Sequence, residues 1–454
     1  MTVTWTAAPP AASEVPHHRT GRWAAERWPL LPLIATVLLL MAPLPAASNA
    51  QGGGVAPADV ASGLLVVCCL GLVLHRRPRP LTPAAAVVLG IPAIGFAVAT
   101  VTAADPQAGL PGFVRYLQVF VLVPVAVVLV IRDARDFRVV TGCLVALALV
   151  QGAVGVHQFA TGTGASYMGA NIRAVGTFGP GDVMGMATVV AYGLLAATAL
   201  ALRTPEGAPG WLRPCALAAA AALVVPLALS FSRGSWIATA AAALAVILLT
   251  GLRQAVRALT VLAAVGVVLV GGLGIGSQMI SQRLTSITEV AEAPDQSVTD
   301  RYTMWAAAAS MWREEPATGV GLKGFPAHRD GHASIGLSAG SDTAGAGQAF
   351  QKQPLLSPHN MYLLVLSEQG LIGFTAFAGS WAAVLIGGVR RLAREHRTRR
   401  TAADCGLAAV GLMIWQMVDF LYADIGGPST VLTGVVLGLA AWWALVVQDE
   451  ATAG

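Results

Sequence analysis

The feature that most constrains the fold is a series of apolar runs, each long enough to cross a lipid bilayer as a helix, which takes about 17–25 residues. Such runs lie near 30–47, 57–75, 81–102, 113–131, 137–160, 183–202, 212–231, 234–250, 255–275, 359–388, 402–423 and 428–447. With 56% hydrophobic and 11% charged residues, the chain is too apolar for a soluble protein of 454 residues. We expect an all-α polytopic membrane protein with about twelve transmembrane helices.

This pattern divides the chain into five parts. The sequence predicts an N-terminal tail over 1–29, helices one to nine over 30–275, a large loop over 276–358, helices ten to twelve over 359–447, and a C-terminal tail over 448–454. The loop is too long for a simple connection, so we expect it to carry structure and function.

The arginines gather in alternate connections, and cytoplasmic loops of membrane proteins retain Arg and Lys. They are Arg19, Arg22, Arg27, Arg76, Arg77, Arg79, Arg132, Arg135, Arg138, Arg203, Arg213, Arg253, Arg257, Arg390, Arg391, Arg394, Arg397, Arg399 and Arg400. The pattern predicts cytoplasmic termini and an extracytoplasmic loop 276–358. The net charge of +5 therefore reflects the membrane topology and does not indicate nucleic-acid binding. The first run ends in a signal-peptide-like Pro45–Ala50, but its length favours an uncleaved helix.

Within the loop, the residues Ser297–Asp300 can cap a helix that ends before Pro316. Arg301, Trp305 and Trp312 share one face of it, as in an amphipathic helix that lies along the membrane surface with its tryptophans in the interface.

After this helix, Gly319, Gly321 and Gly324 predict turns. The small, polar segment Ser334–Gly347 is predicted to be mobile, and it could gate a site beneath it.

His359 stands at the mouth of the tenth run, in Ser357–Tyr362, and its titratable imidazole suits proton transfer at neutral pH. Arg173, Arg233 and Arg301 come from separate segments that the topology brings to the same membrane face. Their planar guanidinium groups match phosphate oxygens bidentately, so the cluster suits a pyrophosphate. The alternative is that each arginine pairs with a carboxylate, and the candidates are Asp182, Asp419 and Asp424.

Glu368 follows His359 by nine residues, which puts it on the opposite side of a regular helix and ~13 Å deeper. We therefore expect a structural buried carboxylate, paired with an arginine of another helix, and not a partner of His359. Tyr362 lies one turn below His359 and could contact a substrate or mark the membrane interface. Further candidates for acceptor or glycan contacts are Asn360, Lys323 and His328.

No metal site or cofactor is expected. His328 and His332 have an i, i+4 spacing that could hold zinc, but Gly331 disfavours a helix there and no third ligand is evident. The cysteines, which suggest no disulfide framework, are Cys68, Cys69, Cys143, Cys215 and Cys405. Nucleophile-elbow, P-loop and dinucleotide-binding motifs are absent from the sequence.

The chain resembles the O-antigen ligase and polymerase family of bacterial membrane glycosyltransferases over roughly 171–374. The resemblance rests on Arg173 with Gly176-Thr177-Phe178-Gly179, on Ser232-Arg233-Gly234, and on the series Arg301, Trp305, Gly319–Phe325, His359-Asn360 and Glu368–Gly373. The chain departs from it at Gly179-Pro180-Gly181-Asp182, where many relatives carry an Asn-Pro-Asn-like turn, so the role of this loop is open.

The resemblance implies metal-independent, inverting transfer of a glycan from a polyprenyl-pyrophosphate carrier to an acceptor hydroxyl. Arg233 and Arg301 would hold the pyrophosphate with help from Arg173, and His359 would activate the acceptor. The implied partners are the lipid-linked glycan donor, a glycan, lipid or protein acceptor, and membrane lipid. The implied location is the bacterial cytoplasmic membrane, with the site facing outward.

Two alternatives remain open. A polysaccharide polymerase of the same family uses the same donor chemistry and differs in its acceptor. A flippase or transporter of lipid-linked saccharides predicts ionisable groups near mid-membrane and broken helices.

Overall fold

A computed structural model describes residues 27–43, 56–76, 81–167, 173–179, 182, 184–251, 253, 256–257, 260, 296–338, 340–345, 351–353, 355–398 and 402–446. The predicted span at 255–275 lies almost wholly outside the described residues. The same holds for the stretch Pro45–Ala50, for most of the tail 1–29 and for the tail 448–454.

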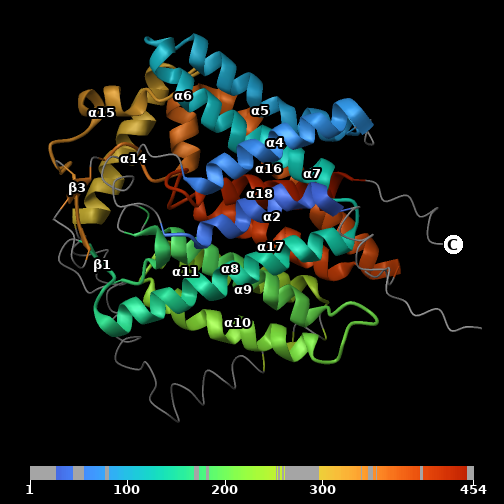
Figure 1. Cartoon of the computed structure of the whole chain (residues 1–454). Helices are drawn as coiled ribbons and strands as arrows, with labels where there is room; N and C mark the ends of the chain where they lie inside the picture. The colour runs from blue at the N-terminus through green and yellow to red at the C-terminus, as the bar shows by residue number, and fades with distance from the viewer. Residues whose placement is uncertain are drawn as a thin grey trace, which may run out of the picture.

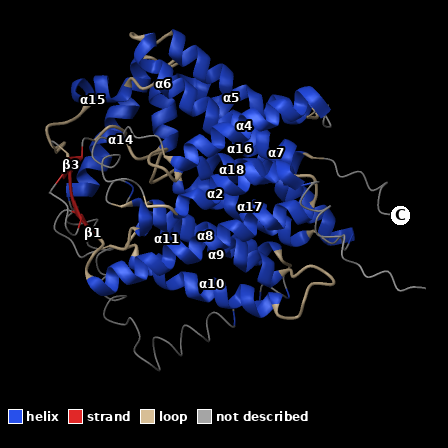
Figure 2. Cartoon of the chain, viewed as in Figure 1, coloured by secondary structure: helices blue, strands red, loops and turns tan. Residues whose placement is uncertain are grey.

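Helices dominate the molecule, as Figures 1 and 2 show. In chain order the elements are η1 (Trp28–Leu30), α2 (Leu31–Leu38), η2 (Leu39–Met41), α4 (Pro57–Arg76), α5 (Pro83–Val101), α6 (Pro106–Leu117), η3 (Gln118–Leu122), α7 (Val123–Val130), α8 (Ala134–Thr161), β1 (Ala165–Tyr167), η4 (Gly176–Phe178), α9 (Gly185–Leu202), α10 (Leu212–Leu229), α11 (Arg233–Leu249), α14 (Gln296–Glu314), α15 (Phe325–His332), β2 (Ser341–Gly345), β3 (Gln351–Gln353), α16 (Met361–Thr398), α17 (Ala403–Asp419) and α18 (Thr430–Leu445).

Seven helices of the described part are long and apolar enough to cross a membrane, which confirms a multi-pass membrane protein. They are Pro57–His75, Pro83–Val101, Pro106–Val130, Ala134–Thr161, Gly185–Leu202, Leu212–Leu229 and Met361–Glu395. Shorter apolar helices cover Trp28–Met41, Arg233–Leu249 and Thr430–Leu445, and α17 lies within the predicted run 402–423. The described residues therefore support the predicted pattern of runs but do not establish the number twelve.

The bundle has two chemically different ends. Helices α14 and α15 and the strands gather at one end, which we call the loop end (Figure 1). The opposite end, where α8 and α17 begin, carries ion pairs between arginines and aspartates at or near the starts of these helices. Arg27 pairs with Asp133 at 3.0 Å, and Arg138 pairs with Asp404 at 2.6 Å.

Close helix contacts inside the bundle depend on small residues. Gly434 and Gly438 of α18 face the continuous helical stretch η3–α7. An added Cβ at Gly434 would lie 2.6 Å from the carbonyl oxygen of Val119 in η3, and one at Gly438 would lie 2.5 Å from the Cβ of Val127 in α7. This small-xxx-small spacing lets two backbones approach closely, and van der Waals packing drives helix association in lipid.

A three-stranded antiparallel sheet in the order β1-β2-β3 was not predicted. It pairs Ser166 with Ala344 and Asp342 with Lys352, and so joins the α8–α9 connection to the segment after α15. Part of the segment predicted to be mobile thus forms β2, because a partner strand almost 180 residues earlier in the chain supplies its backbone hydrogen bonds.

The predicted loop helix is confirmed as α14, which spans Gln296–Glu314 and ends before Pro316. Its residues Met304 and Met311 are fully buried in the protein core. The helix is therefore docked on the protein by its apolar side.

The long helix α16 is broken at Gly370, whose φ of 59° and ψ of −163° are not helical. The connection between α14 and α15 lies in the break. The amides of Val320 and Gly321 donate to the carbonyls of Ser367 and Glu368 at 2.9 and 3.1 Å. On the other side of Gly370, the amides of Leu371 and Ile372 donate to the carbonyls of Pro316 and Ala317 at 2.8 and 3.2 Å. Non-helical backbone at membrane depth is tolerated only where its polar groups are satisfied in this way.

We expect Gly370→Ala to destabilise the protein strongly. An alanine at this φ and ψ, a combination found almost only at glycine, costs about 1–3 kcal/mol, and its Cβ would also clash with the backbone of Ala317. Gly379→Ala, farther along the same helix with open space around it, is the matched control. Folded yield and thermal unfolding in detergent measure both, and equal stability of the two variants would contradict the break.

Candidate functional site

His359 lies at the loop end, directly before α16. Asn360 caps this helix, because its Oδ1 accepts from the amide of Leu363 at 3.0 Å. The amide of Met361 and the Nδ2 of Asn360 donate to carbonyls of the turn 420–424 that follows α17, at 2.9 and 3.1 Å. Two segments 60 residues apart in the sequence thus hold the imidazole in place.

The environment of His359 combines burial with charges of both signs. The ring is partly buried, and desolvation lowers the pKa of His359 from its ordinary value of 6.5. The positive charge of Arg301 lowers it further, whereas the carboxylate of Asp424 opposes the shift. The neutral imidazole is therefore favoured near pH 7, as a proton acceptor requires.

Arg301 reaches the site from α14. Trp305, one turn farther along, donates its indole N–H to the carbonyl of Pro358 at 2.8 Å and so fixes α14 beside His359. Arg301 interacts electrostatically with His359 and with Asp419, the last residue of α17. Among the described residues, no ion pair within 4.0 Å joins Arg301 to a carboxylate.

Arg233 is the first residue of α11. Ser232 caps this helix by accepting from the amide of Ser235 at 3.3 Å. The next residue, Gly234, packs on Tyr422 of the turn 420–424, where an added Cβ would lie 3.1 Å from the Cβ of Tyr422. Within the described part of the chain, Arg233 has no carboxylate partner within ion-pair distance. The turn 420–424 therefore adjoins both His359 and the start of α11.

Arg173 lies on the same end of the bundle. Its backbone pairs with Ala165 through hydrogen bonds of 2.7 and 3.0 Å, and the next amide, of Ala174, donates to the carbonyl of Leu229 at 3.2 Å. Leu229 ends α10, four residues before Arg233. The Arg173 segment thus lies beside the start of α11.

Asp182, which the sequence offered as a partner for an arginine, is bound elsewhere. Its Oδ2 accepts from the hydroxyl and the amide of Ser429 at 2.9 and 3.4 Å. Burial raises the pKa of Asp182 to about 6, although the Ser429 bonds act against this shift. Its role is to join the loop before α9 to the turn before α18.

Strained backbone is concentrated in this region. The described non-glycine residues with positive φ are Phe231 (50°), Lys323 (63°) and His359 (50°). Each is a bulky residue in a conformation that costs about 1–3 kcal/mol, and such strain tends to occur at functional sites, where the surrounding contacts impose it. One of the three is the histidine already described, and Phe231 lies two residues before Arg233.

The structure gives three of the candidate contact residues local partners. The hydroxyl of Tyr362 donates to the carbonyl of Met417 at 2.8 Å, and the Nδ1 of His328 lies 2.9 Å from the carbonyl oxygen of Gly324 in α15. Lys323 is exposed, with its Nζ 5.8 Å from the centre of the Tyr116 ring. Only Asn360, the fourth candidate, directly adjoins His359, and its amide already caps α16.

Glu368 is buried as predicted, with 1% of its surface exposed. The prediction that it pairs with an arginine of another helix is wrong among the described residues. Its Oε1 accepts from the amide of Phe325 at 3.2 Å, at the first residue of α15, and Lys323 provides the nearby positive charge. A carboxylate at a helix N-terminus is favoured by the unpaired amides and the helix dipole. The break at Gly370 brings that terminus to Glu368, and no pattern in the sequence predicts the break.

Asp424 is the functional candidate that the sequence did not single out for this role. The sequence predicts it only as a possible partner for an arginine. In the structure it interacts electrostatically with His359, and its Oδ2 is buried with no hydrogen-bond partner among the described residues. The signal in the sequence was an acidic residue just after an apolar run, which does not reveal which helix the residue faces.

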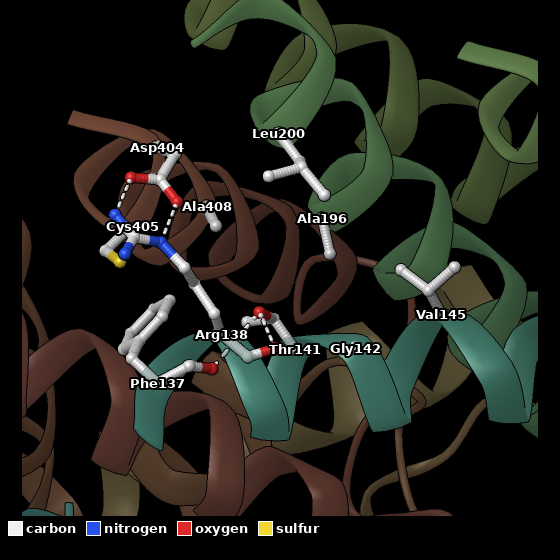
Figure 3. Close-up of a pocket in the computed structure, with 10 residues that line it drawn as sticks. All are labelled: Phe137, Arg138, Thr141, Gly142, Val145, Ala196, Leu200, Asp404, Cys405 and Ala408. Carbon is white, nitrogen blue, oxygen red and sulfur yellow. Dashed lines mark hydrogen bonds and ion pairs between the residues drawn. The ribbon is translucent and has the colours of Figure 1, made fainter. Parts of the chain in front are cut away.

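A cavity at the opposite end of the bundle does not belong to this cluster. It lies between α8, α9 and α17, and Arg138 there binds both oxygens of Asp404, at 2.6 and 2.8 Å (Figure 3). The remaining lining is mostly apolar, and its one described guanidinium is already paired. Within the described residues, no group of three or more His, Cys, Asp or Glu side chains could hold a metal ion.

The fold and the loop-end cluster define a multi-pass membrane protein with a histidine, two arginines and two carboxylates at one end of its helix bundle. Residues 218–378, about a third of the chain, match the family described as O-antigen ligase. This match confirms the resemblance over that segment, and members of the matched family are glycosyltransferase-like enzymes. It includes Arg233, Arg301 and His359, whereas Arg173, Asp419 and Asp424 lie outside it. No curated protein matches the chain.

Proposed function

We propose that the protein transfers a glycan from a polyprenyl-pyrophosphate carrier to an acceptor hydroxyl at the extracytoplasmic face of the cytoplasmic membrane. The observation that carries this proposal is the placement of Arg301 beside His359, with the turn 420–424 connecting His359 to the start of α11, where Arg233 lies. Arg233 and Arg301 have no carboxylate ion pair among the described residues, so both guanidinium groups can meet a phosphate.

In the proposed reaction, the acceptor oxygen attacks the anomeric carbon from the face opposite the pyrophosphate. The bond from that carbon to the phosphate oxygen breaks, and its electron pair leaves with the polyprenyl pyrophosphate. His359 takes the proton of the acceptor hydroxyl, and the carboxylate of Asp424 stabilises the imidazolium that forms. Because attack and departure occur on opposite faces, the configuration at the anomeric carbon is inverted.

The arginines act on the leaving group. Fixed positive charges aimed at the oxygens where negative charge develops lower the barrier most when they are already in place. In this proposal the guanidinium groups supply that charge without a metal, and Arg173, on the neighbouring segment, assists them. The outward orientation is supported by the position of the arginine-rich connections at the opposite end of the bundle.

One observation favours the transporter alternative, because broken membrane helices often line a transport path and α16 is broken at Gly370. The freed amides of Leu371 and Ile372, however, are bound by Pro316 and Ala317 and not directed at a substrate. The break therefore fastens the α14–α15 unit to the bundle, which supports the enzyme over the transporter.

The test is to incubate the purified protein, in lipid nanodiscs, with a polyprenyl-pyrophosphate-linked glycan and candidate acceptors. We expect free polyprenyl pyrophosphate to appear only when an acceptor is present. Transfer to a second copy of the lipid-linked glycan indicates the polymerase, and transfer to a different acceptor indicates the ligase. Movement of intact donor across proteoliposomes without release of polyprenyl pyrophosphate would instead establish the transporter.

A further inference from the structure

An aromatic pair on α14 lies next to the proposed reaction centre and has no role in the transfer described above. Tyr302 has 58% of its surface exposed. Its ring meets that of Trp305 edge to face, with centroids 5.6 Å apart and planes at 86°. The tyrosine ring thus contacts the Trp305 ring while much of the side chain faces outward.

This pair is held rigidly. The indole N–H of Trp305 donates to the carbonyl of Pro358 at 2.8 Å, and Pro358 directly precedes His359. Tyr302 directly follows Arg301 in the helix. Trp305 lies one helical turn after Arg301 and contacts the residue before His359, so it places the aromatic pair beside both groups.

The packing of α14 does not explain Tyr302. The side of the helix that docks on the protein consists of small and flexible apolar residues, namely Met304, Ala307, Ala308 and Met311, all fully buried. A large ring left exposed next to a polar cluster is a feature of binding sites.

We infer that Tyr302 and Trp305 form a platform for a sugar ring, belonging to either the donor glycan or the acceptor. A pyranose presents C–H groups on its faces, which pack on the negative face of an aromatic ring, while its hydroxyls stay at the rim within reach of the phenol. This inference rests on the proposed function, because it places the ring next to the groups that hold the pyrophosphate and activate the acceptor.

The alternative is that the two rings lie in the membrane interface, where Tyr and Trp are also enriched. An interfacial anchor uses its indole N–H to bind water and lipid headgroups, whereas the N–H of Trp305 is bound to Pro358. The contact to the residue before His359 favours the sugar platform.

The experiment compares Tyr302→Leu, which keeps an apolar side chain without a ring, with Tyr302→Phe, which restores the ring. Trp211→Leu is the matched control, since Trp211 is 62% exposed in the connection between α9 and α10 at the opposite end of the bundle. Transfer is measured in nanodiscs while donor and acceptor are titrated separately. We expect Tyr302→Leu to raise one KM about five- to tenfold and Tyr302→Phe to recover most of that loss.

The substrate whose KM rises identifies the source of the sugar. Unchanged KM values in Tyr302→Leu would overturn the platform while leaving glycan transfer standing. Reduced membrane insertion or yield of Tyr302→Leu with an unchanged KM would assign the ring to the membrane interface. This result would also contradict the platform. If the wild-type protein transfers nothing, the proposed function fails, and equilibrium binding of a labelled glycan to wild-type and Tyr302→Leu protein then decides the platform by itself.

Discussion

Replacing His359 by alanine is expected to lower the rate of glycan transfer about 10²- to 10⁴-fold, the usual contribution of a general base. The fold should persist, because the ring is only partly buried and the contacts that fix this segment come from Asn360 and the backbone of Met361. Transfer is measured as polyprenyl pyrophosphate released per folded protein, with thermal unfolding recorded alongside. His157→Ala, an exposed histidine near the loop end of α8, is the matched control and should transfer normally.

The pH dependence gives this prediction a second test. Desolvation lowers the pKa of His359 below 6.5, so the acid limb of the rate profile should lie below pH 6.5, with full activity above it. The carboxylate of Asp424 raises that pKa, so Asp424→Asn should move the acid limb to still lower pH as well as reduce the rate. An acid limb that does not move in Asp424→Asn would remove Asp424 from the mechanism, and normal transfer by His359→Ala would remove the histidine.

Local patterns in the sequence predicted the elements that local physics determines. The loop helix α14 ends before Pro316 as predicted, although it already includes Ser297–Asp300, the residues predicted to cap it. The described apolar runs coincide with helices to within a few residues at most ends. The first run is an exception, since its helices end at Met41 and not at residue 47. Hydropathy and capping depend on neighbours in the chain, so these features can be derived without the fold.

The missed features depend on contacts between distant parts of the chain. Gly370 stands in an apolar run and looks like an ordinary small residue, yet its φ is set by Ala317, more than 50 residues earlier. For the same reason the partner of Glu368 proved to be the start of α15 and not an arginine.

The sequence also proposed the candidate site residues without their mutual arrangement. Topology predicts His359 and the three arginines on one face. In the structure the turn 420–424 adjoins both the His359 segment and the start of α11 with Arg233, and Arg301 lies beside His359 on α14. That this turn adds Asp424 to the cluster follows from the docking of α17 against α16, which no periodicity in either helix specifies.

Removal of the guanidinium groups is the second change with a large expected effect. Arg233→Ala and Arg301→Ala should each lower kcat about 10²- to 10³-fold, the typical loss on removing one preorganised group that stabilises developing negative charge. Arg233→Lys and Arg301→Lys keep the charge but lose the planar fork, so their transfer should lie between that of alanine and wild type. Arg313→Ala, an exposed arginine three turns farther along α14 from Arg301, is the control for loss of a positive charge.

Inhibition by the product tests the role of the arginines separately from that of the histidine. Polyprenyl pyrophosphate contains the leaving group but not the acceptor, so its inhibition constant should weaken in the arginine variants and not in a His359 variant that retains measurable transfer. The lysine variants matter most at Arg301, because alanine there would leave Asp419 without its nearby positive charge and could disturb the fold. If the lysine and alanine variants of both arginines bind this product as tightly as wild type does, the pyrophosphate is held by other groups. The loop-end cluster would then retain only its acceptor side, formed by His359 and Asp424.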